Sequence, residues 1–207
     1  HDSGAYTGEV SGPMLAKLSQ DLLKANADPK VRVVILTGAG RAFCVGLDLV
    51  DATQGSGIGS TSQAQAVSVN LDLRNTPPPI LFGMDKPTIC ALNGASDGYG
   101  LDTAMGCDIR IMGESSKLAA AFGKRGVVPE SGGTWLLPRL VGWSKAAELI
   151  FTGRTLSAAD SLALGLTNEV GLAQAWQDAR IINIADGTNE ILARTIAQRL
   201  LGGDVEI

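Results

Sequence analysis

The sequence predicts an α/β fold in which helices wrap a mainly parallel sheet. Short runs of β-branched and other apolar residues have the length of strands and end at glycines, and stretches with helical spacing of apolar residues lie between them. Strands that alternate with helices join as parallel neighbours. The chain has 207 residues, 45% of them hydrophobic, which suffices for one large domain or a domain with an appendage.

The first predicted element is a helix that begins at Met14. Residues 1–13 before it are small and polar and indicate a loop. The helix stops before Pro29, because a proline disfavours helical backbone at the residue that precedes it. Four leucines have the spacing of one helix face: Leu15, Leu18, Leu22 and Leu23.

Three apolar runs predict strands. The run VRVVILTG at 31–38 is rich in β-branched residues and suits a strand buried on both faces, and KPTICALNG at 86–94 indicates a second buried strand. DIRIMG at 108–113 predicts the third strand. Between the first two, residues 51–68 are rich in Gly, Ser and Gln and predict a mobile segment.

Four later stretches predict helices. GYGLDTAMGC at 98–107 indicates a short helix of small residues. SGGTWLLPRLVG at 131–142 and SKAAELIFTG at 144–153 follow, and RTLSAADSLALGL at 154–166 predicts a further helix.

Composition excludes several classes of function. A net charge of -4 and a pI near 5.0 argue against a general nucleic-acid binder, which needs a basic surface. No apolar run approaches the roughly 20 residues of a membrane span. Cys44, Cys90 and Cys107 have no paired spacing and indicate small buried hydrophobes in a reducing compartment. We therefore expect a cytoplasmic protein.

Histidine is present only at His1. A Ser-His-Asp or Cys-His system is therefore not expected, and neither is a histidine-bearing metal site. Any proton transfer must involve a carboxylate, a tyrosine, a lysine or water. We expect no metal.

Two predicted strands run into glycine-rich turns: LTGAGRAFCVGLDL at 36–49 and ALNGASDGYGLDTAMG at 91–106. Such turns can aim backbone N–H groups at an anion, or their glycines can merely permit tight turns. Neither turn fits a dinucleotide-binding fingerprint, because Phe43 stands where a third glycine is needed. No P-loop motif is present.

Four motifs together resemble the crotonase family, which comprises enoyl-CoA hydratases, isomerases and their relatives. They span about residues 14–170, and the family implies a spiral of ββα turns and an acyl-CoA thioester as substrate. In order, the motifs are RAFCVGLDL, KPTICALNGASDGYGLDTAMGCDIRI, FGKRGVVPESGGTWLLPRLVG and AAELIFTGRTLSAADSLALGL.

The resemblance implies an oxyanion hole made of two backbone N–H groups. The matching positions are Leu47, in VGLD, and Tyr99, in DGYG. Taking an α-proton from a thioester, or adding water to its conjugated alkene, places negative charge on the carbonyl oxygen. Preorganised N–H donors stabilise that charge, at roughly 3 to 4 kcal/mol each in comparable sites.

The resemblance also suggests which carboxylates transfer protons. Of the two glutamates of family hydratases, the first falls on Asp102 and the second on Phe122, which carries no acid. Glu130, in VVPESGG, matches the position where some family isomerases keep a single acid/base. The alternatives are that Glu130 only complements a helix dipole and that Asp102 is a buried structural acid.

For the CoA phosphates, the resemblance points to Arg41, Ala42 and Lys86, which flank the relevant strands. The alternative is that Arg41 and Lys86 are merely solvated charges. No cofactor is implied beyond coenzyme A as part of the substrate. A homotrimer or hexamer is expected.

The chain departs from the family pattern at both ends. Residues 1–13 stand where a strand hairpin is usual, and residues 171–207 replace the long closing helices. Residues 174–203 instead resemble the C-terminal end of acyl-CoA dehydrogenases, without enough chain to build a flavin fold. We therefore expect a crotonase-like spiral truncated at both ends, with a helical tail. We also predict a discontinuity between Glu169 and Trp176, from a recombined gene or from two separate polypeptides.

Two hypotheses of function follow. The first is an enoyl-CoA isomerase or hydratase that works through a stabilised thioester enolate. The second is a non-catalytic acyl-CoA-binding or assembly subunit, in which the fold is kept and the acid/base set is incomplete.

Overall fold

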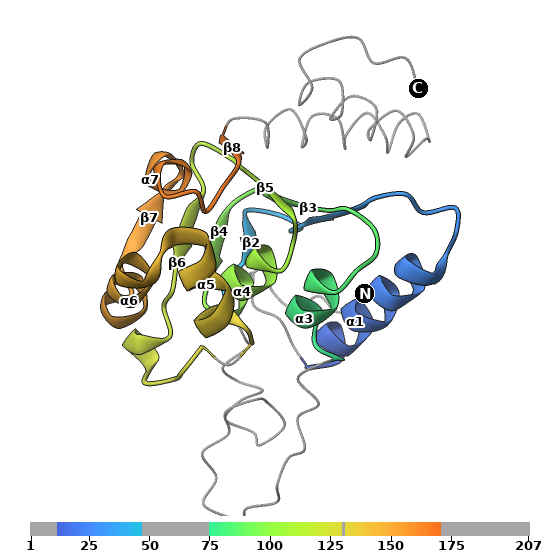
Figure 1. Ribbon diagram of the computed structural model, residues 1–207, viewed down its shortest axis with the longest axis horizontal. Helices are drawn as coiled ribbons and strands as arrows, with labels where there is room; N and C mark the ends of the chain where they lie inside the picture. Colours follow the sequence, from blue (N-terminus) through green and yellow to red (C-terminus); the bar gives the residue numbers. More distant parts are fainter. Residues whose placement is uncertain (1–11, 47–74, 130, 171–207) are drawn as a thin grey trace, which may run out of the picture.

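The computed structural model describes residues 12–46, 75–129 and 131–170 (Figure 1). The expectations for residues 1–11, the segment 51–68 and the tail 171–207 lie outside these ranges, as does the greater part of the predicted discontinuity. The described helices are α1 (Gly12–Ala27), α3 (Pro77–Phe82), α4 (Tyr99–Met105), the 3₁₀ helix η2 (Gly123–Arg125), α5 (Gly133–Val141), α6 (Trp143–Thr152) and α7 (Ala158–Ala163).

The strands form two sheets rather than one. One sheet has the order β1-β3-β5-β8, with every pair parallel, and the other has the order β2-β4-β6-β7, with only the β6–β7 pair antiparallel. The prediction of mainly parallel pairing is confirmed. The strands are β1 (Val34–Thr37), β2 (Ala42–Cys44), β3 (Thr88–Leu92), β4 (Ala95–Asp97), β5 (Ile109–Met112), β6 (Lys117–Ala119), β7 (Thr155–Ser157) and β8 (Glu169–Val170).

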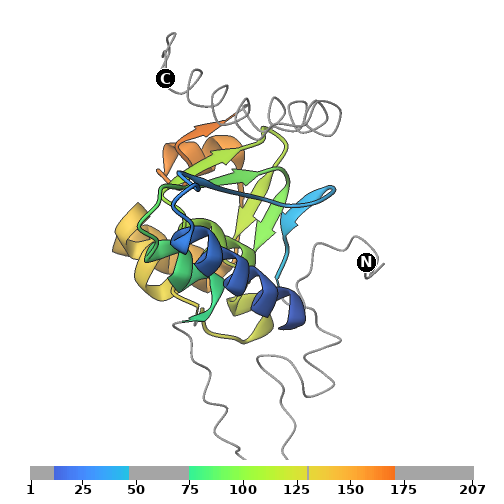
Figure 2. The same cartoon turned by 90° about the vertical axis from the view of Figure 1, so that its right-hand side faces the viewer.

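The chain passes from the first sheet to the second at three successive corners. β1 leads to β2, β3 leads to β4 and β5 leads to β6, so each step along one sheet is matched by a step along the other. Figure 2 shows most of the helices on one side of the strands, with α7 beside strand β8. This arrangement is a spiral of strand pairs, each followed by helical chain.

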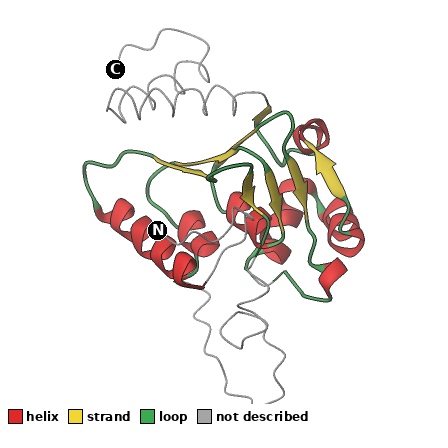
Figure 3. Cartoon of the chain, turned by 180° about the vertical axis from the view of Figure 1, so that it is seen from behind, coloured by secondary structure: helices red, strands yellow, loops and turns green. Residues whose placement is uncertain are grey.

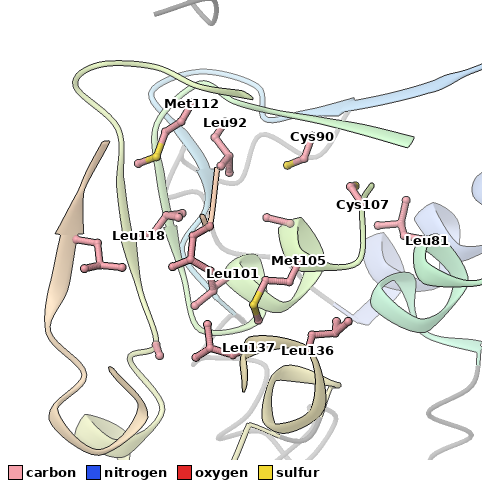
Figure 4. Close-up of a cluster of buried hydrophobic side chains, with 14 of the residues drawn as sticks. Leu81, Cys90, Leu92, Leu101, Met105, Cys107, Met112, Leu118, Leu136 and Leu137 are labelled. Atoms are coloured by element: carbon pink, nitrogen blue, oxygen red, sulfur yellow. The ribbon is translucent and has the colours of Figure 1, made fainter. Parts of the chain in front are cut away.

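The core lies between the sheets and helices α3, α4 and α5 (Figure 3). The small and apolar residues of α4 allow it to be buried along its whole length. Figure 4 shows how this packing brings side chains of strands and helices together, including Leu92, Met112, Leu101, Met105 and Leu137.

Three expectations for local structure were wrong. β1 is only half-buried, and among the described strands it has a single neighbour, β3. Leu23 is 48% exposed, so the buried face of α1 includes Leu15 and Leu22 but not Leu23. The stretch 154–166 begins with strand β7, which pairs with β6, and only its later part is helix α7.

A buried arginine ties strand β5 to the last residues of the described chain. Arg110 of β5 is 5% exposed. Its Nε donates to the carbonyl of Leu166 at 2.7 Å and its Nη1 to that of Cys107 at 2.6 Å. Because burial disfavours the charged form, the pKa of this guanidinium is lowered from its ordinary value. In the described ranges no helix is both long and apolar enough to cross a bilayer.

Candidate active site

Strands β2 and β4 bring the two glycine-rich turns together. They pair in parallel, with Ala42 opposite Ala95 and Cys44 opposite Ser96. Two residues of β2 therefore match one of β4, which is an irregularity of the β-bulge kind. Counting along the sequence, Leu47 follows Cys44 by three residues, and Tyr99 follows Ser96 by three.

At the ends of β2 and β4, the backbone of Cys44 lies in close contact with the backbone at the start of α4. A Cβ added to Gly100 would lie 2.0 Å from the carbonyl oxygen of Cys44, so only glycine fits there. Gly46 lies against the carbonyl of Asp97, 3.9 Å from its own would-be Cβ. Leu47 itself lies outside the described residues, but the residues immediately before it contact the turn that carries Tyr99.

Tyr99 is the first residue of α4, as the sequence predicts. Its N-cap, Gly98, has a φ of 53° and no side-chain cap. The first N–H groups of a helix have no acceptor within the helix and carry the positive end of its dipole. The Tyr99 side chain is 5% exposed, and burial raises the pKa of the phenol, which is neutral at physiological pH.

Asp102 is fully buried and faces the start of α5. A Cβ added to Gly133, the first residue of α5, would lie 2.3 Å from Oδ1 of Asp102. Asp102 lines an apolar crevice with Pro129 and Gly133, which stand on either side of Glu130. Glu130 lies outside the described residues. Asp102 therefore shares one crevice with residues that precede and follow Glu130 in the sequence.

Phe122 stands at the same crevice with an apolar ring. The ring lies 3.8 Å from the position of a Cβ on Gly98, beside the start of α4. Phe122 also lines the crevice that Asp102 lines, and it packs against the main core. Phe122, on which the resemblance places the second glutamate of family hydratases, therefore presents only an apolar ring to the crevice.

Asp97 is a further half-buried carboxyl group near the turn. Burial raises its pKa, and the charges of Lys124 and Arg125 on η2 oppose that rise with a smaller effect. Asp97 does not cap the following helix, because the N-cap of α4 is Gly98 and no side-chain cap is present there. Asp108 has a structural role: it accepts hydrogen bonds from the N–H and hydroxyl of Thr88 at 2.8 Å each.

The three residues predicted to hold CoA phosphates are not gathered in one place. Ala42 begins β2, and exposed Arg41 precedes it, beside the corner that follows β3. Lys86 lies before the amino end of β3, where its ammonium group donates to the carbonyl of Asp28. A strand of five residues separates the two ends, about 16 Å at 3.3 Å per residue.

Sequence reasoning missed Asn93, which follows β3. Its carboxamide hydrogen-bonds to backbone groups of the turn between β1 and β2. A signal was present, because an amide side chain between a buried strand and a glycine is well placed to bond backbone at a corner. Within the described ranges no three His, Cys, Asp or Glu side chains gather as metal ligands do.

Comparison with known proteins agrees with this geometry. Residues 10–191 match the family model for enoyl-CoA hydratase/isomerase. Among curated relatives, 1,2-epoxyphenylacetyl-CoA isomerase of Escherichia coli is 37% identical over 185 residues, covering 89% of this chain and 66% of the relative. Enoyl-CoA hydratase domain-containing protein 2 of Bos taurus is 37% identical over 155 residues, covering 74% of this chain and 50% of the relative.

A solved structure gives the same result. The enoyl-CoA hydratase of Bacillus anthracis superposes with a TM-score of 0.70 at 32% identity, covering 90% of this chain and 68% of that one. Fold and paired strand ends thus define a crotonase-type α/β protein. The chain belongs to the enoyl-CoA hydratase/isomerase family. It spans 66% or less of the length of the two curated relatives described above.

Proposed function

We propose that this chain acts on an enoyl-CoA thioester, by moving its double bond or by adding water to it, through an enolate held by the N–H groups of Leu47 and Tyr99. The observation that carries the proposal is the pairing of β2 with β4. Leu47 and Tyr99 each follow this pairing of Cys44 with Ser96 by three residues in the sequence, and Gly100 lies in contact with Cys44, which supports the proposal. Two donors that serve one oxygen must each reach it at about 2.9 Å.

Glu130 is the proposed principal acid/base. One carboxylate can take a proton from the α- or γ-carbon of the acyl group and return it to the other carbon, with the enolate oxygen charged in between. Asp102, buried beside the flanks of Glu130, is the proposed second acid. Phe122 favours isomerisation over hydration, because its ring supplies no base to activate a water molecule.

Among the proposed CoA contacts, Arg41 and Ala42 lie near the turn before β2, whereas Lys86 lies at the far end of β3. We propose that Arg41 and Ala42 bind the nucleotide end of CoA and that Lys86 has a structural role at the carbonyl of Asp28. No cofactor other than the CoA of the substrate is included in the proposal.

A second candidate is a non-catalytic acyl-CoA-binding or assembly subunit. The apolar Phe122 ring beside the start of α4 favours it, since the site then lacks one of two carboxylates that hydratases of the family use. Such a subunit would keep affinity for acyl-CoA without turnover.

The test is a turnover assay on a panel of 2-enoyl- and 3-enoyl-CoA esters of several chain lengths, alongside calorimetric binding of the saturated acyl-CoA. Isomerisation or hydration of any member supports an enzyme. Binding without turnover of any ester supports the subunit, and neither binding nor turnover overturns both.

We further propose a homotrimer or hexamer in the cytoplasm, with no nucleic-acid partner. The family resemblance and the net charge of -4 support these points. Light scattering coupled to size exclusion measures the assembly directly, and a monomer would contradict it.

A further inference from the structure

We infer that Asn93 is the positioning residue that fixes strand β2 on strand β4 and so sets where the first oxyanion donor lies. The inference rests on the proposed function only for its catalytic consequence. Its structural part concerns two corners of the fold. The first runs from Thr37, at the end of β1, to Ala42, at the start of β2, and the second runs from Leu92 to Ala95.

Asn93 lies in the second corner and hydrogen-bonds to the first. Its Oδ1 accepts from the N–H of Gly38 at 3.0 Å, and its Nδ2 donates to the carbonyl of Gly40 at 2.9 Å and to that of Ala42 at 3.3 Å. The hydroxyl of Thr37 donates to the carbonyl of Ala91 at 2.9 Å and lies 3.4 Å from Oδ1. Both halves of the carboxamide are therefore engaged with the same turn.

The backbones of the two corners also touch. A Cβ on Gly94 would lie 2.0 Å from the carbonyl oxygen of Arg41. Within the first corner, a Cβ on Gly38 would lie 2.3 Å from the carbonyl oxygen of Ala42. The N–H of Gly38 is directed at Asn93. Close packing thus accounts for Gly38, a glycine of the first glycine-rich turn, without a bound anion.

Strand β2 needs this outside restraint. It has three residues, and its register on β4 shifts between Ala42 and Cys44. A ladder this short and irregular fixes its own register weakly, whereas a slip of one residue turns every side chain to the other face. Asn93 holds Ala42 directly before the shift.

The consequence for catalysis follows from counting. With the observed shift, Leu47 and Tyr99 each come three residues after a paired position, Cys44 opposite Ser96. Without the shift, a count along the chain from Ala42 opposite Ala95 would match Gly46 with Tyr99 instead. A misplacement of about 1 Å can lower turnover by roughly 100-fold. Asn93 touches no reacting atom, so its effect on turnover comes only from holding strand β2 in place.

The test compares Asn93→Ala with Ser116→Ala. Ser116 is 2% exposed, and its hydroxyl donates to the carbonyl of Leu92 at 3.0 Å, at the same end of β3 but away from the turn before β2. Each variant removes side-chain bonds to backbone at a corner. Readouts are the melting temperature, amide hydrogen exchange of the segment 38–46, and kcat and KM on the best enoyl-CoA substrate of the wild type.

For Asn93→Ala, amide exchange in 38–46 should accelerate at least about tenfold, and kcat should fall at least about tenfold. For Ser116→Ala, exchange in that segment and kcat should stay within about twofold of wild type, although the melting temperature falls. If Asn93→Ala does not fold, Asn93→Ser takes its place with the same readouts.

Unchanged exchange in the Asn93 variant would overturn the inference, and faster exchange with unchanged kcat would overturn its catalytic part. An equal loss of kcat in the Asn93 and Ser116 variants would show that Asn93 only stabilises the fold and does not position β2. If the wild type turns over no ester, the proposed function fails, while the exchange comparison still decides whether Asn93 fixes β2.

Discussion

The carbonyl oxygen of Cys44 lies 2.0 Å from the point where Gly100 would carry a Cβ. Two backbones therefore meet at the start of α4 with no room for a side chain. Gly100→Ala should lower the free energy of unfolding by about 1–3 kcal/mol and displace β2 from α4. Chemical denaturation measures the loss. Gly83→Ala is the control, since its Cβ would lie 3.4 Å from the nearest atom, the carbonyl of Pro79. Equal stability of the two variants would contradict the close contact.

The acid/base role of Glu130 is tested by Glu130→Gln. The substitution keeps the size and removes the proton chemistry, so turnover should fall by at least about 100-fold with acyl-CoA affinity nearly unchanged. Steady-state kinetics and calorimetry measure the two quantities. Wild-type turnover in this variant would show that Glu130 is not the principal acid/base and would assign that role to Asp102 or to a water molecule.

The contact between Asp102 and Gly133 is tested by a double-mutant cycle. Gly133→Ala places a methyl group 2.3 Å from Oδ1 of Asp102 and should cost about 1–3 kcal/mol of stability. In an Asp102→Ala background the same change should cost clearly less, because the opposing oxygen is gone. Denaturant midpoints of the four proteins give the coupling, and additive effects would argue against the contact.

The raised pKa of Asp97 predicts a pH-dependent contribution to stability. Burial favours the protonated form in the folded state, so this contribution is fully present below the unfolded pKa and is lost as pH rises through the folded pKa. Asp97→Asn mimics the protonated form. Its melting temperature relative to wild type should therefore rise from about pH 4 to pH 7. A difference that falls over this range would show that Lys124 and Arg125 outweigh the burial, and a constant difference would show that the two effects cancel; either result would contradict the raised pKa.

The predicted discontinuity between Glu169 and Trp176 is tested by the mass of the intact protein. Separate polypeptides would each have a smaller mass. A single species of 21.4 kDa would leave a continuous chain, as a recombined gene would produce.

The fold was predictable where local sequence and tertiary environment agree. β3, β5 and helices α4 to α6 follow from apolar runs bounded by glycines, and their burial bears out the pattern. β1 lies within its predicted range, but its burial was predicted wrongly because a β-branched run does not reveal how many neighbours a strand will have. β7 was missed because three residues are too few to show a period, and its partner β6 is distant in sequence.

Less of the candidate site could be predicted. Tyr99 and Asp102 lie on the short helix that the sequence predicts, while their roles stay predictions. Arg41 and Lys86 are equivalent in the sequence, since each flanks a strand. A flanking position does not reveal at which end of the sheet the side chain lies. The proposed role of Asn93 depends on hydrogen bonds between two corners that are more than 50 residues apart in the sequence and meet only in the folded chain.

The bonds around Arg110 also bear on the order of synthesis. Its guanidinium, N–H and carbonyl are satisfied by Leu166, Asn168 and Thr167, more than 50 residues downstream. A nascent chain that has emerged only as far as α6 must therefore keep this arginine hydrated, with the middle of β5 open to water. Completion of the first sheet is coupled to the last described residues, so folding of this domain on the ribosome should finish late rather than proceed strand by strand.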